Sequence, residues 1–248
     1  MAEHFVWGTC MDGEVEIISY DDEKHREQSM EVLRRSFFKN EAVAIGSGIK
    51  DDLQAQKDLE HLCSEAGQGG VSLIAKHIPS GEIVGVSFNG LQTRPIPGEI
   101  NYIAQFRDNH CFSESSKSGL NYMLTMDTKV NLFERFNIDC LLEIMFLSTL
   151  IEYEGKGIAT KLVSYSVDLA TALSKGQAPE CLPEDARQMR PKLVSALFTS
   201  RISQRVGAKN GFSVVHEVPY DEFSFQGKTY AERIGPDHPT SILVVKEI

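Results

Sequence analysis

The sequence predicts a single α/β domain, in which a mixed sheet of about seven strands is flanked by helices. Two observations lead to this prediction. The run from Cys140 to Leu147 is short and almost entirely apolar, which is typical of a central strand buried on both faces. A glycine-containing turn and an amphipathic helix follow it, and strand and helix patterns alternate over the remaining sequence. We therefore expect one domain over residues 1–248, long enough to bury its core without disulfides.

The elements before the central strand follow from periodicity and turn signals. Alternating apolar residues indicate the first strand, and Asp21 is a typical cap for the helix that follows. Leu53 is expected to face the core with the other leucines of its helix, and Pro79-Ser80-Gly81 is a hairpin signal. The expected elements are a strand at 15–18, helices at 23–38 and 52–65, hairpin strands at 71–77 and 83–89, and a long helix at 117–136.

The second half continues the alternation. The helix after the central strand places Ile158, Leu162, Ser166 and Leu169 on one face. The segment 174–191 is rich in Pro, Lys, Glu and Gln, so we expect an exposed, mobile surface insertion. Strands are then predicted at 193–199, 212–218 and 241–245, with a short helix at 200–209.

Composition narrows the class of protein. The formal charge of −10 argues against general nucleic-acid binding and suits a cationic substrate, although many proteins are acidic for solubility alone. The five cysteines are scattered and odd in number, which favours a reducing, cytoplasmic compartment and argues against a metal site. Residues 1–4 show no signal-peptide pattern, and no apolar run is long enough for a membrane span.

The turn Glu152-Tyr153-Glu154-Gly155-Lys156-Gly157 separates the central strand from its helix. This arrangement directs backbone N–H groups and a helix dipole at an anion, and glycine lets a phosphate approach the backbone. Its spacing fits neither a Walker loop nor a dinucleotide fingerprint. The turn resembles the acetyl-CoA pyrophosphate loop of the GNAT acetyltransferases, Gln/Arg-x-x-Gly-x-Gly/Ala, with Glu152 in place of Gln or Arg. A plain strand-to-helix turn is the alternative interpretation.

Further segments resemble the insect arylalkylamine N-acyltransferases, in the same order along almost the whole chain. The matching segments are Phe37-Phe38-Lys39-Asn40-Glu41, Asn131-Leu132-Phe133-Glu134, Thr199-Ser200-Arg201-Ile202-Ser203, Val218-Pro219-Tyr220 and Pro236-Asp237-His238. The resemblance implies a GNAT fold with a mostly antiparallel sheet. It also implies acyl transfer from acetyl-CoA to a small primary amine, such as an arylalkylamine or another biogenic amine, without a metal, nucleic acid or membrane as partner.

The resemblance assigns roles to individual residues. Glu41 corresponds to the general base, which acts within a ternary complex, and Asn40 and Ala42 replace an Asp and a Pro of the family. Thr199, Ser203 and His238 are the other catalytic candidates. Each has a structural alternative, since Glu, Ser and Thr often cap helices and histidine often bonds to loop backbone.

The implied coenzyme site lies along the central strand and the turn. The N–H of Leu147 is the candidate for polarising the thioester carbonyl. The implied coenzyme-binding residues are Leu147, Ser148, Thr149, Glu154, Gly155, Lys156, Gly157, Ile158 and Ala159. Tyr153, Phe38 and Tyr220 are candidates for an aromatic pocket, although aromatic residues more often belong to the core.

Two other functions stay open at this point. The departures at Asn40, Ala42 and Glu152 are compatible with a non-catalytic coenzyme A-binding protein on the same fold. Acetylation of a protein amino group is the third possibility, which an open groove would favour over a closed pocket. The sequence does not identify the amine, the acyl-chain preference or the oligomeric state.

Overall fold

The computed structural model describes residues 5–96 and 98–248, so residues 1–4, where no signal peptide is expected, lie outside the described part. Its main sheet has eight strands in the order β1-β2-β3-β4-β5-β6-β10-β7. Neighbouring strands pair antiparallel except β5 and β6, which are parallel. The mixed, mostly antiparallel sheet flanked by helices is therefore confirmed, with one strand more than the seven expected.

The strands are β1 (Val6–Cys10), β2 (Val15–Ser19), β3 (Leu73–His77), β4 (Ile83–Thr93), β5 (Cys140–Thr149), β6 (Leu193–Phe198), β7 (Ser213–Pro219), β8 (Ser224–Phe225), β9 (Lys228–Thr229) and β10 (Thr240–Glu247). The helices are α1 (Asp22–Val32), α2 (Phe38–Asn40), α3 (Ala42–Gly46), α4 (Leu53–Gln68), α5 (Tyr102–His110), α6 (Glu114–Lys129), α7 (Leu132–Arg135), α8 (Ile158–Ser174), α9 (Glu184–Gln188), α10 (Arg201–Lys209) and α11 (Tyr230–Ile234). Short single turns are η1 (Met11–Gly13), η2 (Leu33–Phe37), η3 (Ile49–Asp51), η4 (Ile151–Tyr153) and η5 (Tyr220–Glu222).

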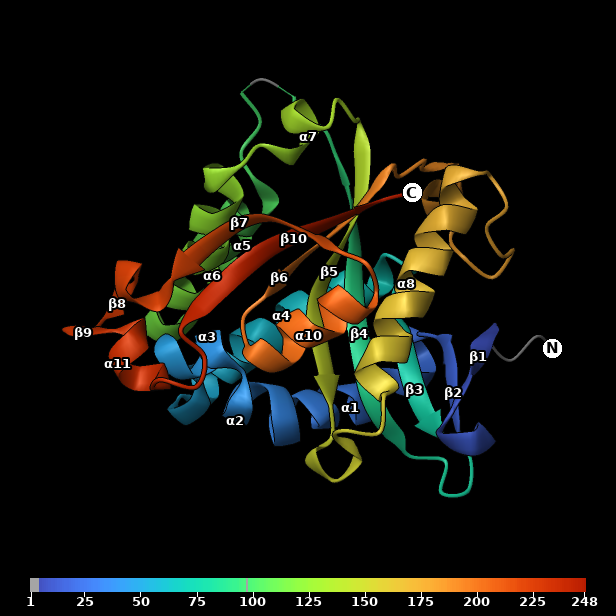
Figure 1. The fold of residues 1–248 in the computed structure, drawn as a ribbon, viewed down its shortest axis with the longest axis horizontal. Helices are drawn as coiled ribbons and strands as arrows, with labels where there is room; N and C mark the ends of the chain where they lie inside the picture. Colours follow the sequence, from blue (N-terminus) through green and yellow to red (C-terminus); the bar gives the residue numbers. More distant parts are fainter. Residues whose placement is uncertain (1–4, 97) are drawn as a thin grey trace.

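Helices cover both faces of the sheet. In Figure 1, α8 and α10 lie in front of the sheet, and α4, α5 and α6 lie behind it. The helix α8 packs against β3, β4 and β5, and α10 packs against α8 and β6. The predicted face of α8 is confirmed, because Ile158, Leu162, Ser166 and Leu169 are all buried.

The strands β5 and β6 separate after a short parallel ladder. Glu143 pairs with Ser195 and Ile144 with Ala196, and among the described residues the ladder ends there. On its other edge, β5 has a bulge at Met145, because Phe88 pairs with Phe146 while Asn89 pairs with Ile144. The bulge and the separation open the centre of the sheet, where β5 and β6 diverge in Figure 1.

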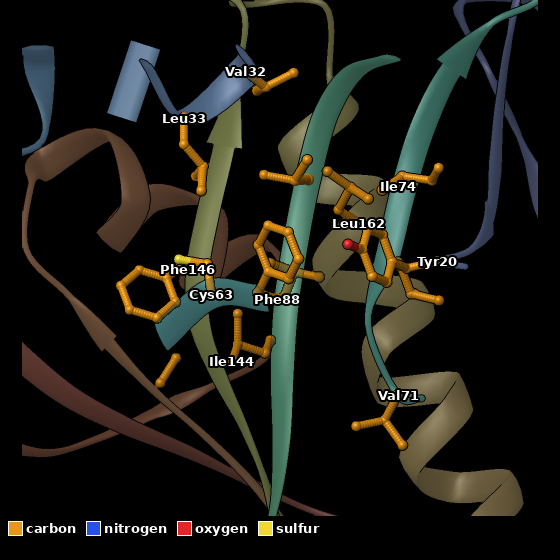
Figure 2. Packing of buried hydrophobic residues seen from close by; sticks show 14 of the residues in the cluster. Tyr20, Val32, Leu33, Cys63, Val71, Ile74, Phe88, Ile144, Phe146 and Leu162 are labelled. Carbon is orange, nitrogen blue, oxygen red and sulfur yellow. The ribbon is translucent and has the colours of Figure 1, made fainter. Parts of the chain in front are cut away.

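The main core includes residues of β4 and β5 and of helices on both faces of the sheet. Phe88 and Phe146 are register partners, and the ring of Tyr20 packs edge-on against Phe88 at 5.3 Å between centroids. Figure 2 shows these side chains together with Leu33 from η2 and Cys63 from α4. This buried packing holds β5 rigidly up to the point where it leaves β6.

The first helical region departs from a regular α-helix at two points. A π-helical turn, Leu33–Phe37, follows α1, and the chain leaves the helical conformation at Glu41, whose φ and ψ are −70° and 137°. The prediction of one helix over 23–38 missed the π turn, a feature frequent at functional sites. The break places Glu41 at the N-cap of α3.

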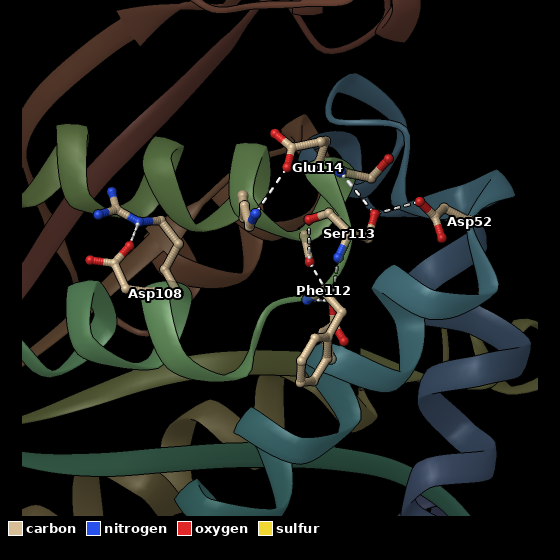
Figure 3. Close-up of polar contacts among 10 residues, drawn as sticks. Asp52, Asp108, Phe112, Ser113 and Glu114 are labelled. Atoms are coloured by element: carbon tan, nitrogen blue, oxygen red, sulfur yellow. Dashed lines mark hydrogen bonds and ion pairs between the residues drawn. The ribbon is translucent and has the colours of Figure 1, made fainter.

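A buried carboxylate joins α4 to the start of α6. Asp58 accepts hydrogen bonds from the N–H groups of Phe112 (2.9 Å) and Ser113 (3.1 Å) and from Ser116 Oγ (2.6 Å). Figure 3 shows this region, including the bond from Ser113 to Asp52. The carboxylate, the two N–H groups and the hydroxyl thus satisfy one another, and the bonds fix the start of α6 beside α4.

The structure corrects two expectations, on the helix at 117–136 and on Leu53, and it contains elements that were not predicted. The helix expected at 117–136 is two helices, because Val130 is extended and Asn131 caps α7. Helix α5 and strand β1 were not predicted. The strand β1 is a short segment, Val6–Cys10, at the edge of the sheet. Leu53 is 71% exposed, because it directly follows the cap at the start of α4.

The segment 174–191 is largely exposed, yet several of its residues are anchored. Leu182 and Ala186 are buried in the main core, and Pro183 packs against Gly70. Its mobility stays a prediction, which hydrogen exchange would test. Within the described ranges, no helix combines the length and apolar character that a bilayer span requires.

Candidate active site

A cavity of about 600 Å³ passes through the opening between β5 and β6. Its lining comes from both faces of the sheet, with α8 and α10 on one side and α3 and α6 on the other. The volume is typical of a pocket for a small organic ligand. We call the part beside α8 and α10 the turn side, and the part beside α3 and α6 the carboxylate side.

The turn side begins at the glycine turn before α8. Gly155 and Gly157 have φ values of 73° and 85°, which disfavour any residue with a Cβ. A Cβ built on either glycine meets no other atom within 4 Å, so the backbone faces open space here. The N-terminal N–H groups of α8, a helix of 17 residues, have no intrahelical acceptors and can bind an anion.

The backbone of β5 also faces the cavity. The Leu150 N–H donates to Val84 O on β4 at 2.9 Å. Peptide groups alternate in direction along an antiparallel strand, so Leu147 and Thr149 direct theirs away from β4, into the gap. Consistently, Thr149 O accepts a hydrogen bond from Ser36 Oγ at 2.7 Å.

Two charged residues of the turn lie outside the lining of the cavity. Glu152 forms an ion pair with Arg35, which lies in the π turn and also contacts Glu82. The ammonium of Lys156 lies 4.7 Å from the centre of the Tyr153 ring. The departure at Glu152 therefore adds no unpaired negative charge beside the turn, and Lys156 is held by a cation–π contact.

Glu41 occupies the carboxylate side. Its Oε2 accepts a hydrogen bond from the Ala44 N–H at 2.7 Å, so Glu41 caps α3, which is the structural role considered as the alternative. Its Oε1 is buried without a protein hydrogen-bond partner. Burial raises the pKa of the Glu41 carboxyl, whereas Thr199, the backbone N–H groups of Val43 and Ala44, and His238 act to lower it. A buried carboxylate with a free oxygen and a raised pKa is suited to accept a proton near neutrality.

The other catalytic candidates line the same cavity. Ser203 is the third residue of α10, and it forms a capping box with Ser200, bonding to its N–H (3.1 Å) and carbonyl oxygen (3.0 Å). His238 accepts from the Arg201 N–H at 3.4 Å. The structure thus brings Glu41, Thr199, Ser203 and His238 to one cavity, and Ser203 also has a structural partner.

Of the coenzyme candidates, Lys156 is the one whose side chain is directed elsewhere. The candidates that line the cavity are Leu147, Ser148, Thr149, Glu154, Gly155, Gly157, Ile158 and Ala159. The aromatic-pocket hypothesis is wrong for two of its three residues. Phe38 and Tyr220 are fully buried in the core, where Tyr220 donates to Thr199 O at 2.6 Å, whereas Tyr153 lines the cavity.

Several lining residues on the carboxylate side were not predicted. Tyr122 and Met123 come from α6, and Glu143 and Met145 come from β5. Tyr122 and Met123 carry no local signal, because a helix that lines a pocket has the same pattern as one that lines a core. Glu143 did carry a signal, since it is the one charged residue in the run from Cys140 to Leu147.

The turn side fits a coenzyme A thioester. It combines an open glycine backbone for a diphosphate, outward-facing strand peptides for an amide-containing arm, and a buried Thr149 hydroxyl without a protein partner. Among the described residues, no group of three or more His, Cys, Asp and Glu side chains is arranged to hold a metal ion.

The separated parallel strands, the bulge and the glycine turn before a helix define the GNAT class of acetyltransferase fold. Solved structures of insect acetyltransferases share it. The chain is similar to arylalkylamine N-acetyltransferase 2 from Aedes aegypti, with 24% identity, a TM-score of 0.75, and coverage of 94% of this chain and 99% of that chain. No protein-family model matches the sequence.

Two more structures extend the comparison. A putative arylalkylamine N-acetyltransferase 7 from the same mosquito is 20% identical, with a TM-score of 0.75 over 99% of this chain and 95% of that chain. A polyamine N-acetyltransferase from Drosophila melanogaster, which forms N-acetylagmatine, is 16% identical, with a TM-score of 0.70 over 94% of this chain and 100% of that chain. At these identities the comparison establishes the fold.

Proposed function

We propose that the chain is an acetyl-CoA-dependent N-acetyltransferase for a small primary amine, such as an arylalkylamine or a related biogenic amine. One observation carries the proposal. A single cavity connects the glycine turn, which suits a diphosphate, with the buried carboxylate of Glu41. The structural neighbours include enzymes that acetylate arylalkylamines and form N-acetylagmatine, which supports this reaction class.

Glu41 acts as the general base in this proposal. An amine is protonated at neutral pH and attacks only after losing a proton, which Glu41 Oε1 accepts directly or through water. The raised pKa of Glu41 brings its proton affinity closer to that of the amine. The neutral nitrogen then attacks the thioester carbonyl carbon in a ternary complex, so that the C–N bond forms and the C–S bond breaks.

The strand β5 stabilises the charge that develops during attack. The Leu147 N–H, directed into the gap, is placed to donate to the carbonyl oxygen as it becomes negative. The leaving thiolate takes up a proton at the end of the reaction, and the hydroxyls of Ser203 and Thr199 are the candidate donors. The scattered free cysteines suit a reducing compartment, and we place the activity in the cytoplasm.

A steady-state assay of thiol release from acetyl-CoA against aryl, imidazole and aliphatic amines tests the proposal. We expect turnover with at least one class of amine and a product that mass spectrometry identifies as the N-acetyl amine. Tight acetyl-CoA binding without turnover on any amine would contradict the proposal and favour a coenzyme A-binding protein. Turnover on peptide amino groups alone would favour a protein acetyltransferase.

A further inference from the structure

The carboxylate side of the cavity contains a second buried acid, Glu143 on β5. Glu143 is one of the residues that line the cavity, although it is only 8% exposed. Residues two apart on a strand share a face, and Leu141 packs with Phe133 of α7. Glu143 therefore faces the α6 and α7 side of the sheet, opposite the glycine turn.

The charge of Glu143 is poorly compensated by the protein. Its Oε2 accepts one hydrogen bond from the Gln92 side chain. Burial raises the pKa of Glu143 to about 8, and repulsion from Asp127 on α6 adds to this effect. Among the described residues, the arginine and the lysine that line the cavity are Arg205 and Lys209. Both belong to α10, on the other side of the sheet from Glu143.

Ionisation of this buried acid is costly unless a ligand supplies a positive partner. An ionised carboxylate in an apolar strand needs a positive partner, and the protein offers one amide instead. Oε2 accepts the hydrogen bond from Gln92, and Oε1 can accept one from a ligand in the cavity that Glu143 lines. A cationic nitrogen placed there would favour ionisation of Glu143, and the ionised carboxylate would favour binding of the cation.

We propose that Glu143 binds a second cationic nitrogen of the amine substrate, so that the substrate is a diamine or an aminoalkylguanidine. The inference rests on the proposed function and deepens it. One nitrogen reacts beside Glu41, and the other stays protonated beside Glu143. The net charge of −10 favours the approach of a dication over that of a neutral ligand.

The test compares two series of substrates and two variants. Linear diamines and aminoalkylguanidines of increasing length are assayed against monoamines of matched length, using the wild type, Glu143→Gln and Glu134→Gln. Glu143→Gln keeps the size of the side chain and an acceptor for Gln92. Glu134→Gln makes the same charge change on the exposed face of α7, and it serves as the control.

We expect the wild type to prefer the dicationic series. Glu143→Gln should lower kcat/KM for that series by roughly 30-fold or more, while changing kcat/KM for monoamines by less than about threefold. Glu134→Gln should behave as the wild type. The length optimum and the better of the two dicationic series identify the second group. Equal losses on both series, or no loss on either, would overturn the inference.

A binding measurement separates this inference from the proposed function. If no amine is acetylated, the proposed function fails, and calorimetry on the coenzyme A-loaded protein then tests Glu143 alone. We expect the diamine to bind the wild type at least tenfold more tightly than Glu143→Gln. Binding of the diamine should also release a proton, which titration in buffers of different ionisation enthalpy detects. Absent or equal binding would overturn the inference.

Discussion

The two sides of the cavity are built from different parts of the polypeptide. The turn side consists mainly of backbone groups, namely the glycines at positions 155 and 157 and the peptides of β5. The carboxylate side consists of buried side chains, above all Glu41 and Glu143, from elements far apart in the sequence. A backbone site can therefore tolerate changes of side chain that a side-chain site cannot.

The two sides differ in how they are affected by residues that depart from the family pattern. The turn has Glu152 where the resembling family has Gln or Arg, and Arg35 pairs with it outside the cavity. On the carboxylate side, Asn40 lines the cavity, and its side-chain amide donates to Ser36 O at 3.1 Å. We infer that the turn side determines the coenzyme, whereas the carboxylate side determines the rate and the choice of amine.

The largest effect is expected from Glu41→Gln. Loss of the base should lower kcat by about 10²–10³-fold while leaving acetyl-CoA affinity unchanged, because the turn side is untouched. In the wild type, kcat/KM should rise with pH as Glu41 deprotonates, at a pH above the usual 4.5. The exposed Glu31→Gln on α1 is the control. A normal kcat for Glu41→Gln would remove Glu41 from the mechanism.

The pH dependence of stability gives a second test of the carboxylate side. The folded protein holds a proton on Glu143 up to about 8, whereas the unfolded chain releases it near 4.5. The folded state therefore binds more protons between these values, and stability falls as pH rises through this window, by a few kcal/mol at most. Urea unfolding should show a weaker fall in Glu143→Gln. Identical pH profiles would show that Glu143 ionises normally.

Changes at the turn side should act on binding. Gly157→Ala forces a residue with a Cβ to adopt a φ of 85°, at a cost of about 1–2 kcal/mol, and directs the methyl group into the open space. We expect acetyl-CoA to bind about tenfold more weakly, measured by calorimetry. Gly227→Ala, with a φ of 76° in the turn between β8 and β9, has a similar strain and should bind acetyl-CoA normally. If both variants bind equally well, the turn does not contact the coenzyme.

The smallest effect distinguishes capping from catalysis at Ser203. Both members of the capping box stabilise α10, so Ser203→Ala and Ser200→Ala should each lower stability by about 1 kcal/mol. If Ser203 also donates a proton to the thiolate, kcat should fall further in Ser203→Ala than in Ser200→Ala. Equal kcat values in the two variants would show that the role of Ser203 is structural and not catalytic.

The parts of the molecule that were predictable are local in sequence. The strand β5, the turn and α8 follow one another, so periodicity and glycine spacing were sufficient to place them. Glu41 was found through resemblance, and its burial depends on contacts that its neighbours in sequence do not reveal. Glu143 was passed over as part of an apolar run, because its partners Gln92 and Asp127 belong to β4 and α6. The break at Val130 carried a local signal that was overlooked, because Asn131 is a typical N-cap residue and caps α7.

The central claim is that one cavity holds the coenzyme and the amine on opposite sides of the gap between β5 and β6. A conjugate of coenzyme A joined through an acetyl bridge on its sulfur to the amine nitrogen tests this claim most directly. If the claim holds, the conjugate will bind more tightly than acetyl-CoA or the amine alone, and protein saturated with the conjugate will bind neither of them in calorimetry. Binding of the amine to the conjugate-loaded protein would contradict the claim and show that the amine site lies elsewhere.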